Sequence, residues 1–284
     1  MSDRKIAVIT GSTGGIGGAI ADQLAADGWD LVLVNRNAEK ASQQKADLNA
    51  AHPSANIDLI RADLMDVDQI KRAAREILAM HPCIDALYNN SGVLTSQRVM
   101  SPQGHESNYA VNTLAPYVML ECLRPALKRA AGMPKTMIVN TTSAAHNAAK
   151  SLDVSTMSEP KDIGGLTGVY ATTKLALTTM GKALAPDLEQ DGIMLRSVCP
   201  GAVVTPMTKT SDAMPGILKF LVPILFSKPE KQAGKMINAA QPDSFGGRTG
   251  IYITNGKEKT APKLAIDASV QVSLMNKLSI DAAL

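Results

Sequence analysis

Short runs rich in β-branched residues alternate with longer stretches rich in alanine, leucine and lysine along the chain. Apolar runs of strand length separated by segments of helix length are the pattern of βα units, in which helices cover a parallel sheet. The sequence therefore predicts an α/β fold, with a doubly wound parallel sheet and helices on both faces. Seven strands are predicted, at residues 5–10, 30–35, 56–61, 84–89, 136–141, 193–198 and 250–254.

The length and composition predict one domain. A chain of 284 residues with 45% hydrophobic residues can bury a large core, and α/β folds of this length often form a single domain. We find neither an internal repeat nor an interdomain linker, so we expect residues 1–284 to form one domain. The connections at 144–167 and 201–232 are longer than ordinary βα loops, and we expect function to vary there.

The most apolar tract lies in the second of these connections, at residues 216–226, and reads GILKFLVPILF. It is too short to span a bilayer and contains Lys219 and Pro223. Its large apolar residues recur at near-helical spacing, which fits a substrate lid within an insertion at about 201–232, part of the core, or a subunit interface. These residues are Ile217, Phe220, Leu221, Ile224 and Leu225.

Charge and cysteine content argue against several other classes of protein. The formal net charge is +3 and the basic residues are scattered, so we expect no nucleic-acid partner. Cys83, Cys122 and Cys199 have neither CxxC nor metal-ligand spacing, and we expect buried thiols in a reducing compartment and no metal. The N-terminus shows no signal-peptide pattern, and the sequence shows no transmembrane segment. A cytoplasmic location is therefore expected.

A glycine-rich sequence, TGSTGGIGGAI, follows the first predicted strand and opens the next helix. Gly11, Gly15 and Gly17 would let the backbone approach a pyrophosphate, and the helix N-terminus would offer free N–H groups. The alternative is a tight turn that needs positive φ. The second strand ends in Asn35 and Arg36, where an arginine favours the 2′-phosphate of NADP unless it is simply exposed to solvent.

Asp63 follows the third predicted strand, in the sequence RADLMD. Its carboxylate could accept a hydrogen bond from the adenine amino group of a dinucleotide. The alternative is the N-cap of the next helix.

Tyr170 and Lys174 stand four residues apart in the sequence GVYATTKLAL. At this spacing the two side chains of a helix share one face, so both heads can reach one ligand. Spacing alone also fits a packed tyrosine beside a solvated lysine, so the other motifs must decide.

Several motifs, in order along most of the chain, resemble those of the short-chain dehydrogenase/reductase family. The resemblance implies a Rossmann-like sheet of order 3-2-1-4-5-6-7. It also implies a nicotinamide cofactor, with NADP(H) preferred and NAD(H) possible. The motifs are TGSTGGIG (10–17), DL (63–64), NNSG (89–92), Asn112 in YAVNTLAPY, Ser143 in IVNTTSAA, YATTK (170–174) and PGAVVT (200–205).

The same resemblance implies the residues of the site. The catalytic set would be Asn112, Ser143, Tyr170 and Lys174. Cofactor contacts would come from Gly11, Ser12, Thr13, Gly15, Ile16, Gly17, Arg36, Asp63, Leu64, Asn90, Gly92, Tyr170, Lys174, Pro200, Gly201, Val203 and Thr205.

Some positions depart from the family's commonest pattern. Ser91 replaces the usual alanine of NNSG, and Gly14 stands where many NADP-dependent relatives have a cation, which leaves the cofactor preference largely to Arg36. Pro186 should bend the helix that carries Tyr170. Ser143 and Tyr170 are 27 residues apart, a wide spacing that resembles the retinol dehydrogenase-like branch.

The family mechanism assigns a role to each catalytic residue. Tyr170 would donate a proton to the developing alkoxide, and lowering its pKa from ~10 towards ~7 requires roughly 4 kcal/mol of preferential stabilisation of the phenolate. Lys174 would supply that stabilisation and hold the nicotinamide ribose. Ser143 would orient the substrate oxygen, and Asn112 would hold a water linking Lys174 to solvent.

Two polar residues near Ser143 need separate interpretation. We expect His146 to be a loop histidine rather than a second base. Thr142 could donate a hydrogen bond beside Ser143, but we expect its side chain to pack at the strand end.

The leading hypothesis is an NADP(H)-dependent alcohol dehydrogenase or carbonyl reductase acting on a small, largely apolar alcohol or carbonyl compound. The alternatives are reduction of a conjugated carbon–carbon double bond and a non-catalytic sensor of NADP. A homodimer or homotetramer is possible.

Overall fold

The computed structural model describes residues 4–129, 133–204 and 226–284. Within these ranges one sheet of eight strands runs in the order β3-β2-β1-β4-β5-β6-β7-β8. Strands β1 to β7 pair in parallel, which confirms the predicted fold class and their predicted order. The strands are β1 (Ile6–Thr10), β2 (Asp30–Asn35), β3 (Ile57–Arg61), β4 (Ala86–Asn89), β5 (Thr136–Thr141), β6 (Ile193–Cys199), β7 (Ile251–Thr254) and β8 (Lys257–Lys259).

Strand β8 makes the predicted number of seven strands wrong. It pairs antiparallel with β7 across a turn at Asn255 and Gly256, whose φ angles are 52° and 73°. Positive φ at both central residues is the geometry of a type I′ turn, for which Asn-Gly is a preferred pair. The three residues of β8 read KEK and show no apolar alternation, so the Asn-Gly turn was the sequence feature that indicated an additional strand.

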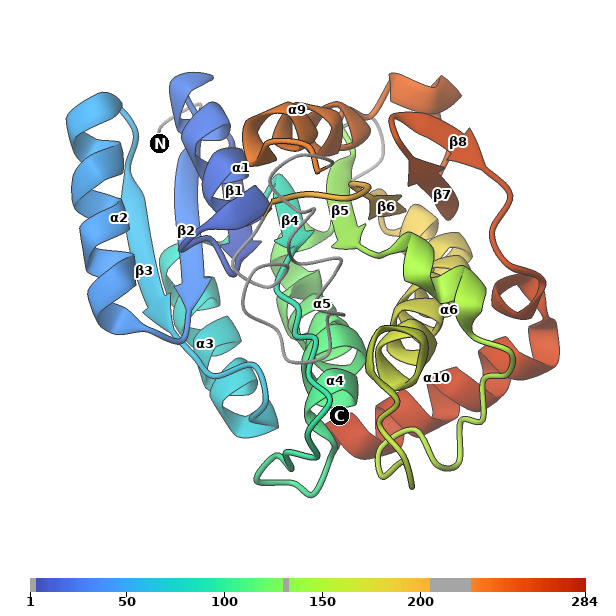
Figure 1. The fold of residues 1–284 in the computed structure, drawn as a ribbon. Helices are drawn as coiled ribbons and strands as arrows, with labels where there is room; N and C mark the ends of the chain where they lie inside the picture. The colour runs from blue at the N-terminus through green and yellow to red at the C-terminus, as the bar shows by residue number, and fades with distance from the viewer. Residues whose placement is uncertain (1–3, 130–132, 205–225) are drawn as a thin grey trace.

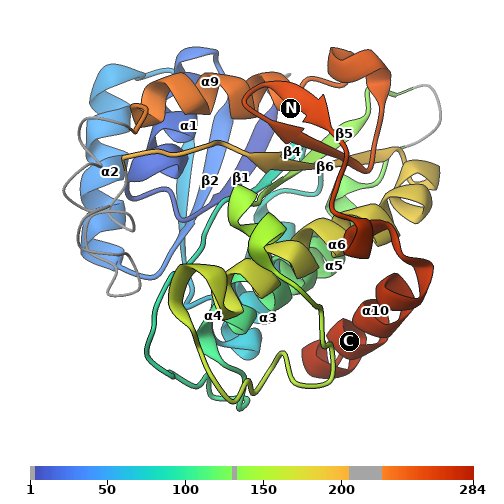
Figure 2. The ribbon, with the colours of Figure 1, turned by 45° about the vertical axis from the view of Figure 1, so that its right-hand side comes forward.

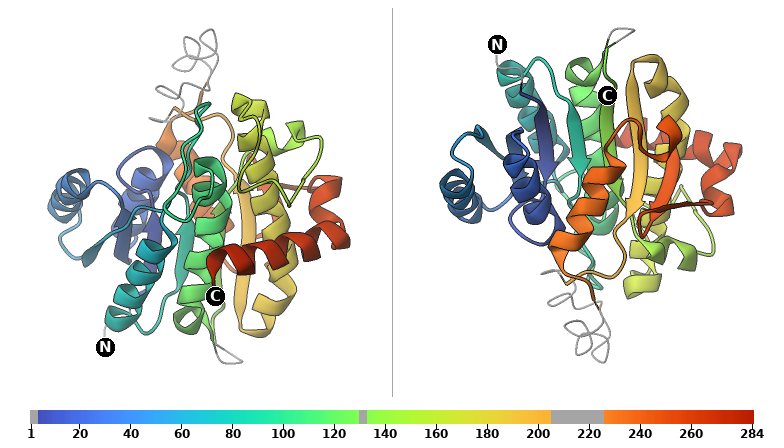
Figure 3. Two further views of the ribbon diagram at one scale, coloured as in Figure 1. Left: turned by 90° about the horizontal axis from the view of Figure 1, so that it is seen from below. Right: turned by 90° about the horizontal axis from the view of Figure 1, so that it is seen from above.

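Helices cover both faces of the sheet (Figures 1 and 2). Helices α1, α2 and α9 lie on one face, and α3, α5, α6 and α10 lie on the other. Figure 3 shows α10 crossing beside α5 and α6 in one view, and α9 beside α1 in the other. The α-helices are α1 (Gly15–Ala26), α2 (Ala38–Ala51), α3 (Val67–Met80), α4 (Ser107–Tyr109), α5 (Ala115–Leu127), α6 (Val169–Gln190), α9 (Pro229–Ala239) and α10 (Ala268–Ala282).

Shorter helical segments join these elements. A π-helix, Ala110–Leu114, continues α4 into α5. The 3₁₀ segments are Ala144–Ala148, Gly165–Thr167, Ser244–Gly247 and Lys263–Ile266.

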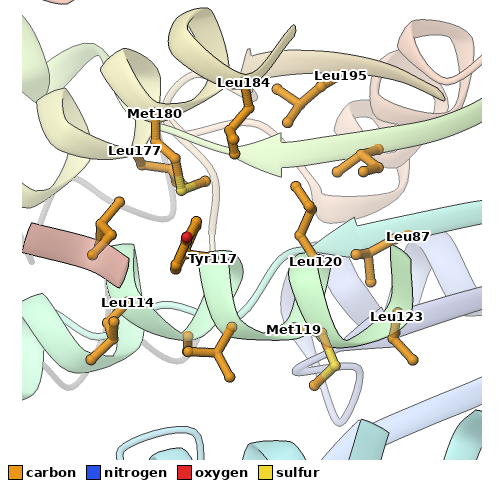
Figure 4. Close-up of a cluster of buried hydrophobic side chains, with 14 of the residues drawn as sticks. Leu87, Leu114, Tyr117, Met119, Leu120, Leu123, Leu177, Met180, Leu184 and Leu195 are labelled. Atoms are coloured by element: carbon orange, nitrogen blue, oxygen red, sulfur yellow. The ribbon is translucent and has the colours of Figure 1, made fainter. Parts of the chain in front are cut away.

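Apolar side chains fill the space between the sheet and each helical layer. Strands β2, β5 and β6 are buried along their whole length, as expected for a parallel sheet covered on both faces. Figure 4 shows side chains of α5 and α6, such as Leu120 and Leu177, gathered beside the strands. This packing fixes α6, which carries Tyr170 and Lys174, against the sheet.

The predicted lid lies largely outside the described residues. Of the tract 216–226, only Phe226 is described, so its assignment to lid, core or interface stays open. The end of the predicted insertion is helical, because α9 begins at Pro229 and packs against α1. Among the helices of the described ranges, none has the length and apolarity needed to cross a bilayer.

Two smaller predictions can be compared with the structure. Helix α6 continues through Pro186, and the bend expected there stays a prediction. The expectation of three buried thiols is wrong for Cys83, which is exposed, and Cys122, which is half-buried, whereas Cys199 is buried. Cys83 follows the end of α3 and lies outside any strand, so nothing covers it among the described residues.

Candidate active site

Close packing requires glycine at two positions of the turn between β1 and α1. A Cβ on Gly17 would lie 2.4 Å from both Asn90 Nδ2 and the Gly11 carbonyl oxygen, and a Cβ on Gly11 would lie 2.5 Å from Ser91 Oγ. Gly11 also has a φ of 68°, which favours glycine. These glycines therefore bring the turn directly against the end of β4.

The N-terminus of α1 has free hydrogen-bonding capacity. Gly14 is its N-cap residue, and no side chain caps the helix. The first N–H groups of an uncapped helix and its dipole together suit an anion. Gly14 and Gly15 both line a cleft, so these donors open towards a ligand-sized space.

Two side-chain amides hold this turn in place. Asn35 Oδ1 accepts hydrogen bonds from the N–H groups of Ser12 (2.9 Å) and Thr13 (3.3 Å). Asn90 Nδ2 donates to the carbonyl oxygens of Thr10 and Gly11, each at 3.1 Å. Asn35 was not predicted as a site residue, and its role is visible only once β2 lies beside β1.

One cleft of about 850 Å³ lies at the carboxyl ends of the strands. Its volume falls in the range usual for small-molecule and cofactor sites. It brings together most of the residues that the sequence predicts for the site. These are Gly11, Thr13, Gly15, Ile16, Arg36, Asp63, Leu64, Asn90, Gly92, Ser143, Tyr170, Lys174, Pro200, Gly201 and Val203.

Of the predicted site residues that the structure describes, three do not line this cleft. Ser12 is buried and its Oγ hydrogen-bonds Gln44 and Asn35, whereas Gly17 packs under the turn as described above. Asn112 is also buried. Thr205 lies outside the described residues. Cofactor contacts by Ser12 and Gly17 stay predictions, and the structure shows that the Ser12 hydroxyl and the Cα of Gly17 pack within the turn itself.

Cations gather where β2 and β3 end. Arg36 is exposed and its Nη1 lies 3.9 Å from Asp63 Oδ2. Lys40, in the first turn of α2, and Arg61, the last residue of β3, line the same cleft and were not predicted. Arg61 could have been found from the predicted strand order, since it ends the strand next to β2. Arg36 is therefore not the only cation at this end of the cleft.

Asp63 does not cap a helix, so that alternative is wrong. Asp66 is the N-cap of α3 and accepts hydrogen bonds from Asp68 N and Gln69 N. One Asp63 oxygen, Oδ1, accepts from Met65 N at 3.0 Å, and the other faces Arg36. The carboxylate therefore stands at the cleft wall rather than at a helix end.

Tyr170 and Lys174 share one face of α6, as the spacing predicts, and both are nearly fully buried at the other end of the cleft. Lys174 Nζ lies 5.9 Å from the centre of the Tyr170 ring and donates to the Thr141 carbonyl oxygen at 2.9 Å. The alternative of a solvated lysine is wrong. The ammonium group faces both the phenol ring and the cleft.

Burial governs the titration of this pair. It raises the pKa of Tyr170 to about 12, although a hydrogen bond with Ser143 acts in the opposite direction. Burial also lowers the pKa of Lys174 to about 8. The protein groups alone therefore do not give the Tyr170 phenol the low pKa that the mechanism requires. Lys174 hydrogen-bonds a backbone carbonyl rather than the phenol oxygen.

Asn112 lies in the π-helix and ties together the two segments beside it. Its Oδ1 accepts from Val93 N at 2.8 Å, and its Nδ2 donates to Val93 O at 2.9 Å and to Thr173 Oγ1 at 3.2 Å. π-Helical turns occur often at functional sites. The water-holding role of Asn112 stays a prediction, while its amide connects the segment after β4 to α6.

His146 is a buried residue rather than an open loop histidine. Its Nδ1 lies 3.1 Å from Thr178 Oγ1, its ring packs on Tyr252, and burial lowers its pKa to about 4. Thr142 is buried and donates to the Lys174 carbonyl oxygen at 3.1 Å, so its hydroxyl serves α6. Neither side chain is placed as a second base.

Comparison with known proteins agrees with this geometry. Residues 5–216 match the family model described as short chain dehydrogenase. The short-chain dehydrogenase TIC 32 B, chloroplastic, of Brassica napus is 29% identical over 272 residues, covering 93% of this chain and 84% of that protein. Mouse (Mus musculus) retinol dehydrogenase 11 is 26% identical over 251 residues, covering 88% and 78%.

A solved structure is also similar to this chain. The blue fluorescent protein from a metagenomic library, crystallised in complex with NADPH, is 27% identical with a TM-score of 0.68, and the match covers 88% of this chain and 96% of that one. The similarity to retinol dehydrogenase 11 also confirms the predicted resemblance to the retinol dehydrogenase-like branch. The chain therefore belongs to the short-chain dehydrogenase family, whose members are oxidoreductases acting on CH–OH groups.

Proposed function

We propose that the chain interconverts an alcohol and an aldehyde or ketone on a largely apolar small molecule, with NADP(H) as cofactor and Tyr170 as general acid and base. The observation that carries the proposal is that one cleft holds both groups of residues. Ser143, after β5, and Tyr170 and Lys174, in α6, line one part of it. The glycine turn after β1 and the cations near the ends of β2 and β3 line another part. A screen of NADPH consumption with aldehydes, ketones and enones tests the proposal.

The residues of the cleft fit a dinucleotide. The turn of Gly11 to Gly17 leaves no room for a Cβ at its ends and presents the uncapped N-terminus of α1, which suits a pyrophosphate. Asp63 and Leu64 would hold the adenine, with Asn90 and Gly92 beside the adjoining ribose. Lys174 would bind the nicotinamide ribose, and the nicotinamide would lie against the segment from Pro200 to Val203 and Thr205. When bound, the nicotinamide accepts or supplies the hydride.

The protein's own groups would handle the proton and the substrate oxygen. Ser143 Oγ would donate to that oxygen and hold the carbonyl carbon facing the hydride. Tyr170 would give its phenolic proton to the developing alkoxide during reduction and recover it during oxidation. Lys174, charged below a pH of about 8, would stabilise the phenolate left behind.

NADPH is expected to be preferred over NADH. Arg36 is exposed, and its guanidinium, 3.9 Å from Asp63, would turn towards a phosphate, with Lys40 and Arg61 lining the same cleft. Charge-assisted contacts contribute roughly 1.5–3 kcal/mol, or about tenfold to a hundredfold in affinity. Replacing Arg36 with alanine should remove much of this difference, measured as the ratio of the two cofactors' dissociation constants.

The NADH affinity of the Arg36→Ala protein is the internal control, since NADH has no 2′-phosphate to lose. Lys40→Ala and Arg61→Ala should each reduce the ratio by a smaller factor. Equal affinities of the wild type for both cofactors would contradict the NADP assignment and leave the hydride-transfer proposal standing.

We propose that an apolar substrate reaches a small apolar cluster that packs on Tyr170, next to the cleft. Leu94 and Tyr170 form a small cluster, with Ala145 and Leu166 packed against it. In a series of straight-chain aldehydes, kcat/KM should rise by up to about fourfold for each methylene buried. Leu166→Ala should flatten this rise, whereas Met80→Ala, an exposed change on α3, should not. A rise of equal slope in all three proteins would remove this surface from the substrate site.

Two alternative functions lead to different observations. Reduction of a conjugated double bond would place hydride on the β-carbon of an enone, and a non-catalytic sensor would bind NADPH without consuming it. The presence of Ser143, Tyr170 and Lys174 in one cleft favours catalysis over sensing. A cytoplasmic location and a homodimer or homotetramer remain predictions, to be checked by fractionation and by mass in solution.

A further inference from the structure

The thiol of Cys199 lies where two segments of the proposed active site meet. Cys199 is the last residue of β6 and is buried. Its Sγ accepts a hydrogen bond from the N–H of Ala144 at 3.2 Å and another from the N–H of Gly201 at 3.4 Å. One sulfur atom therefore connects the residue after Ser143 with a residue of the cleft wall.

A residue of β7, Tyr252, lies near the same sulfur. The Tyr252 ring packs on His146 with the ring centres 4.6 Å apart. His146 in turn lies beside Thr178 of α6. Tyr252 and His146 thus form a chain of contacts from the neighbourhood of the sulfur to the helix that carries Tyr170 and Lys174.

We propose that Cys199 is a positioning residue, whose sulfur fixes the Ser143 segment relative to residues 200–203 at the wall of the cleft. The inference rests on the proposed function, in which Ser143 orients the substrate and residues 200–203 contact the nicotinamide. If the sulfur did not accept these two N–H groups, both segments could shift. Displacements of about 1 Å in an active site can reduce the rate about a hundredfold.

Substitutions at Cys199 distinguish the effect of losing the hydrogen-bond acceptor from the effect of losing side-chain volume. Cys199→Ala and Cys199→Val both remove the hydrogen-bond acceptor, and the valine also fills the space of the thiol. Cys199→Ser keeps an acceptor at the same place. In the acceptor-free proteins, kcat should fall about tenfold to a hundredfold, and the serine variant should recover most of this loss. Cys83→Ala, the same chemical change at an exposed thiol, should match the wild type.

Amide hydrogen exchange in the cofactor-free protein gives a readout that does not depend on turnover. Peptides containing Ala144 and Gly201 should exchange faster in Cys199→Ala or Cys199→Val than in the wild type, with the serine variant close to the wild type. Having two acceptor-free variants keeps the test valid if one of them does not fold. NADPH affinity should weaken in parallel.

Two results would overturn the inference. One is wild-type exchange at both peptides in an acceptor-free variant that folds. The other is a Cys199→Ser protein as impaired as Cys199→Ala, since a hydrogen-bond acceptor at this position would then make no difference. Absence of turnover in the wild type would count against the proposed function alone, because exchange would still report on the sulfur contacts.

Discussion

Replacing Tyr170 with phenylalanine is expected to lower kcat by about 10²–10⁴-fold while leaving NADPH affinity nearly unchanged. The substitution removes only the phenolic oxygen, which is the proposed proton donor. The ring remains to pack against Leu94 and Leu166, so the local fold should persist. Steady-state kinetics with a verified substrate and fluorescence titration of NADPH would measure the two quantities separately.

Lys174→Ala provides the informative comparison. Because Lys174 Nζ faces both the phenol ring and the cleft, its loss should impair kcat and weaken cofactor binding together. A Tyr170→Phe protein with wild-type kcat would show that the general acid has been assigned wrongly. A Lys174→Ala protein with unchanged NADPH affinity would remove Lys174 from the ribose site.

The second large effect concerns stability and lies at Arg196, far from the proposed chemistry. Arg196 is fully buried on β6, and its guanidinium donates to the carbonyl oxygens of Ala239, Gln241, Pro242, Ser244 and Arg248, at distances of 2.8–3.0 Å. Burial lowers its pKa to about 10, so it remains charged at neutral pH. One side chain thus organises the segment between α9 and β7.

Arg196→Met should lower the free energy of unfolding by about 3–5 kcal/mol, because several carbonyl oxygens lose their donor at once. The melting temperature should fall by roughly 10 °C. The stability of Arg196→Lys should lie between those of Arg196→Met and the wild type, since an ammonium group has fewer donors than a guanidinium and lacks its planar geometry.

An exposed change of the same kind serves as the control for Arg196. Arg72→Met, at an exposed position on α3, should change stability by less than about 0.5 kcal/mol. Equal melting temperatures for Arg196→Met and the wild type would contradict the structural role of Arg196.

The sheet could be predicted because its signal is local. Most of the parallel strands, such as β1, β2 and β5, are largely apolar runs between segments of helix length, and a buried parallel strand favours that composition. Strand β8 gives no such signal, since Lys257, Glu258 and Lys259 lie at an edge. Its presence depends on Asn255 and Gly256, a pair that could have been interpreted as a hairpin turn.

The site could be predicted only as far as its motifs are contiguous in sequence. Tyr170 and Lys174 are one helical turn apart, so their shared face follows from geometry. The contribution of Asn35 to the turn, and that of Arg61 to the cleft, depends on neighbouring strands that come from distant parts of the chain. The buried, structural role of Ser12 could not be inferred either, because a motif does not state which way each of its side chains points.

The proposed hydride transfer can be tested directly with NADPH carrying deuterium at C4 of the nicotinamide. Incubated with the wild-type protein and an apolar aldehyde or enone, the labelled cofactor should give an alcohol with deuterium on the carbinol carbon, and Tyr170→Phe should give almost none. Deuterium on the β-carbon of the enone would instead identify a double-bond reductase. NADPH binding without label transfer to any tested carbonyl compound would contradict the proposed function.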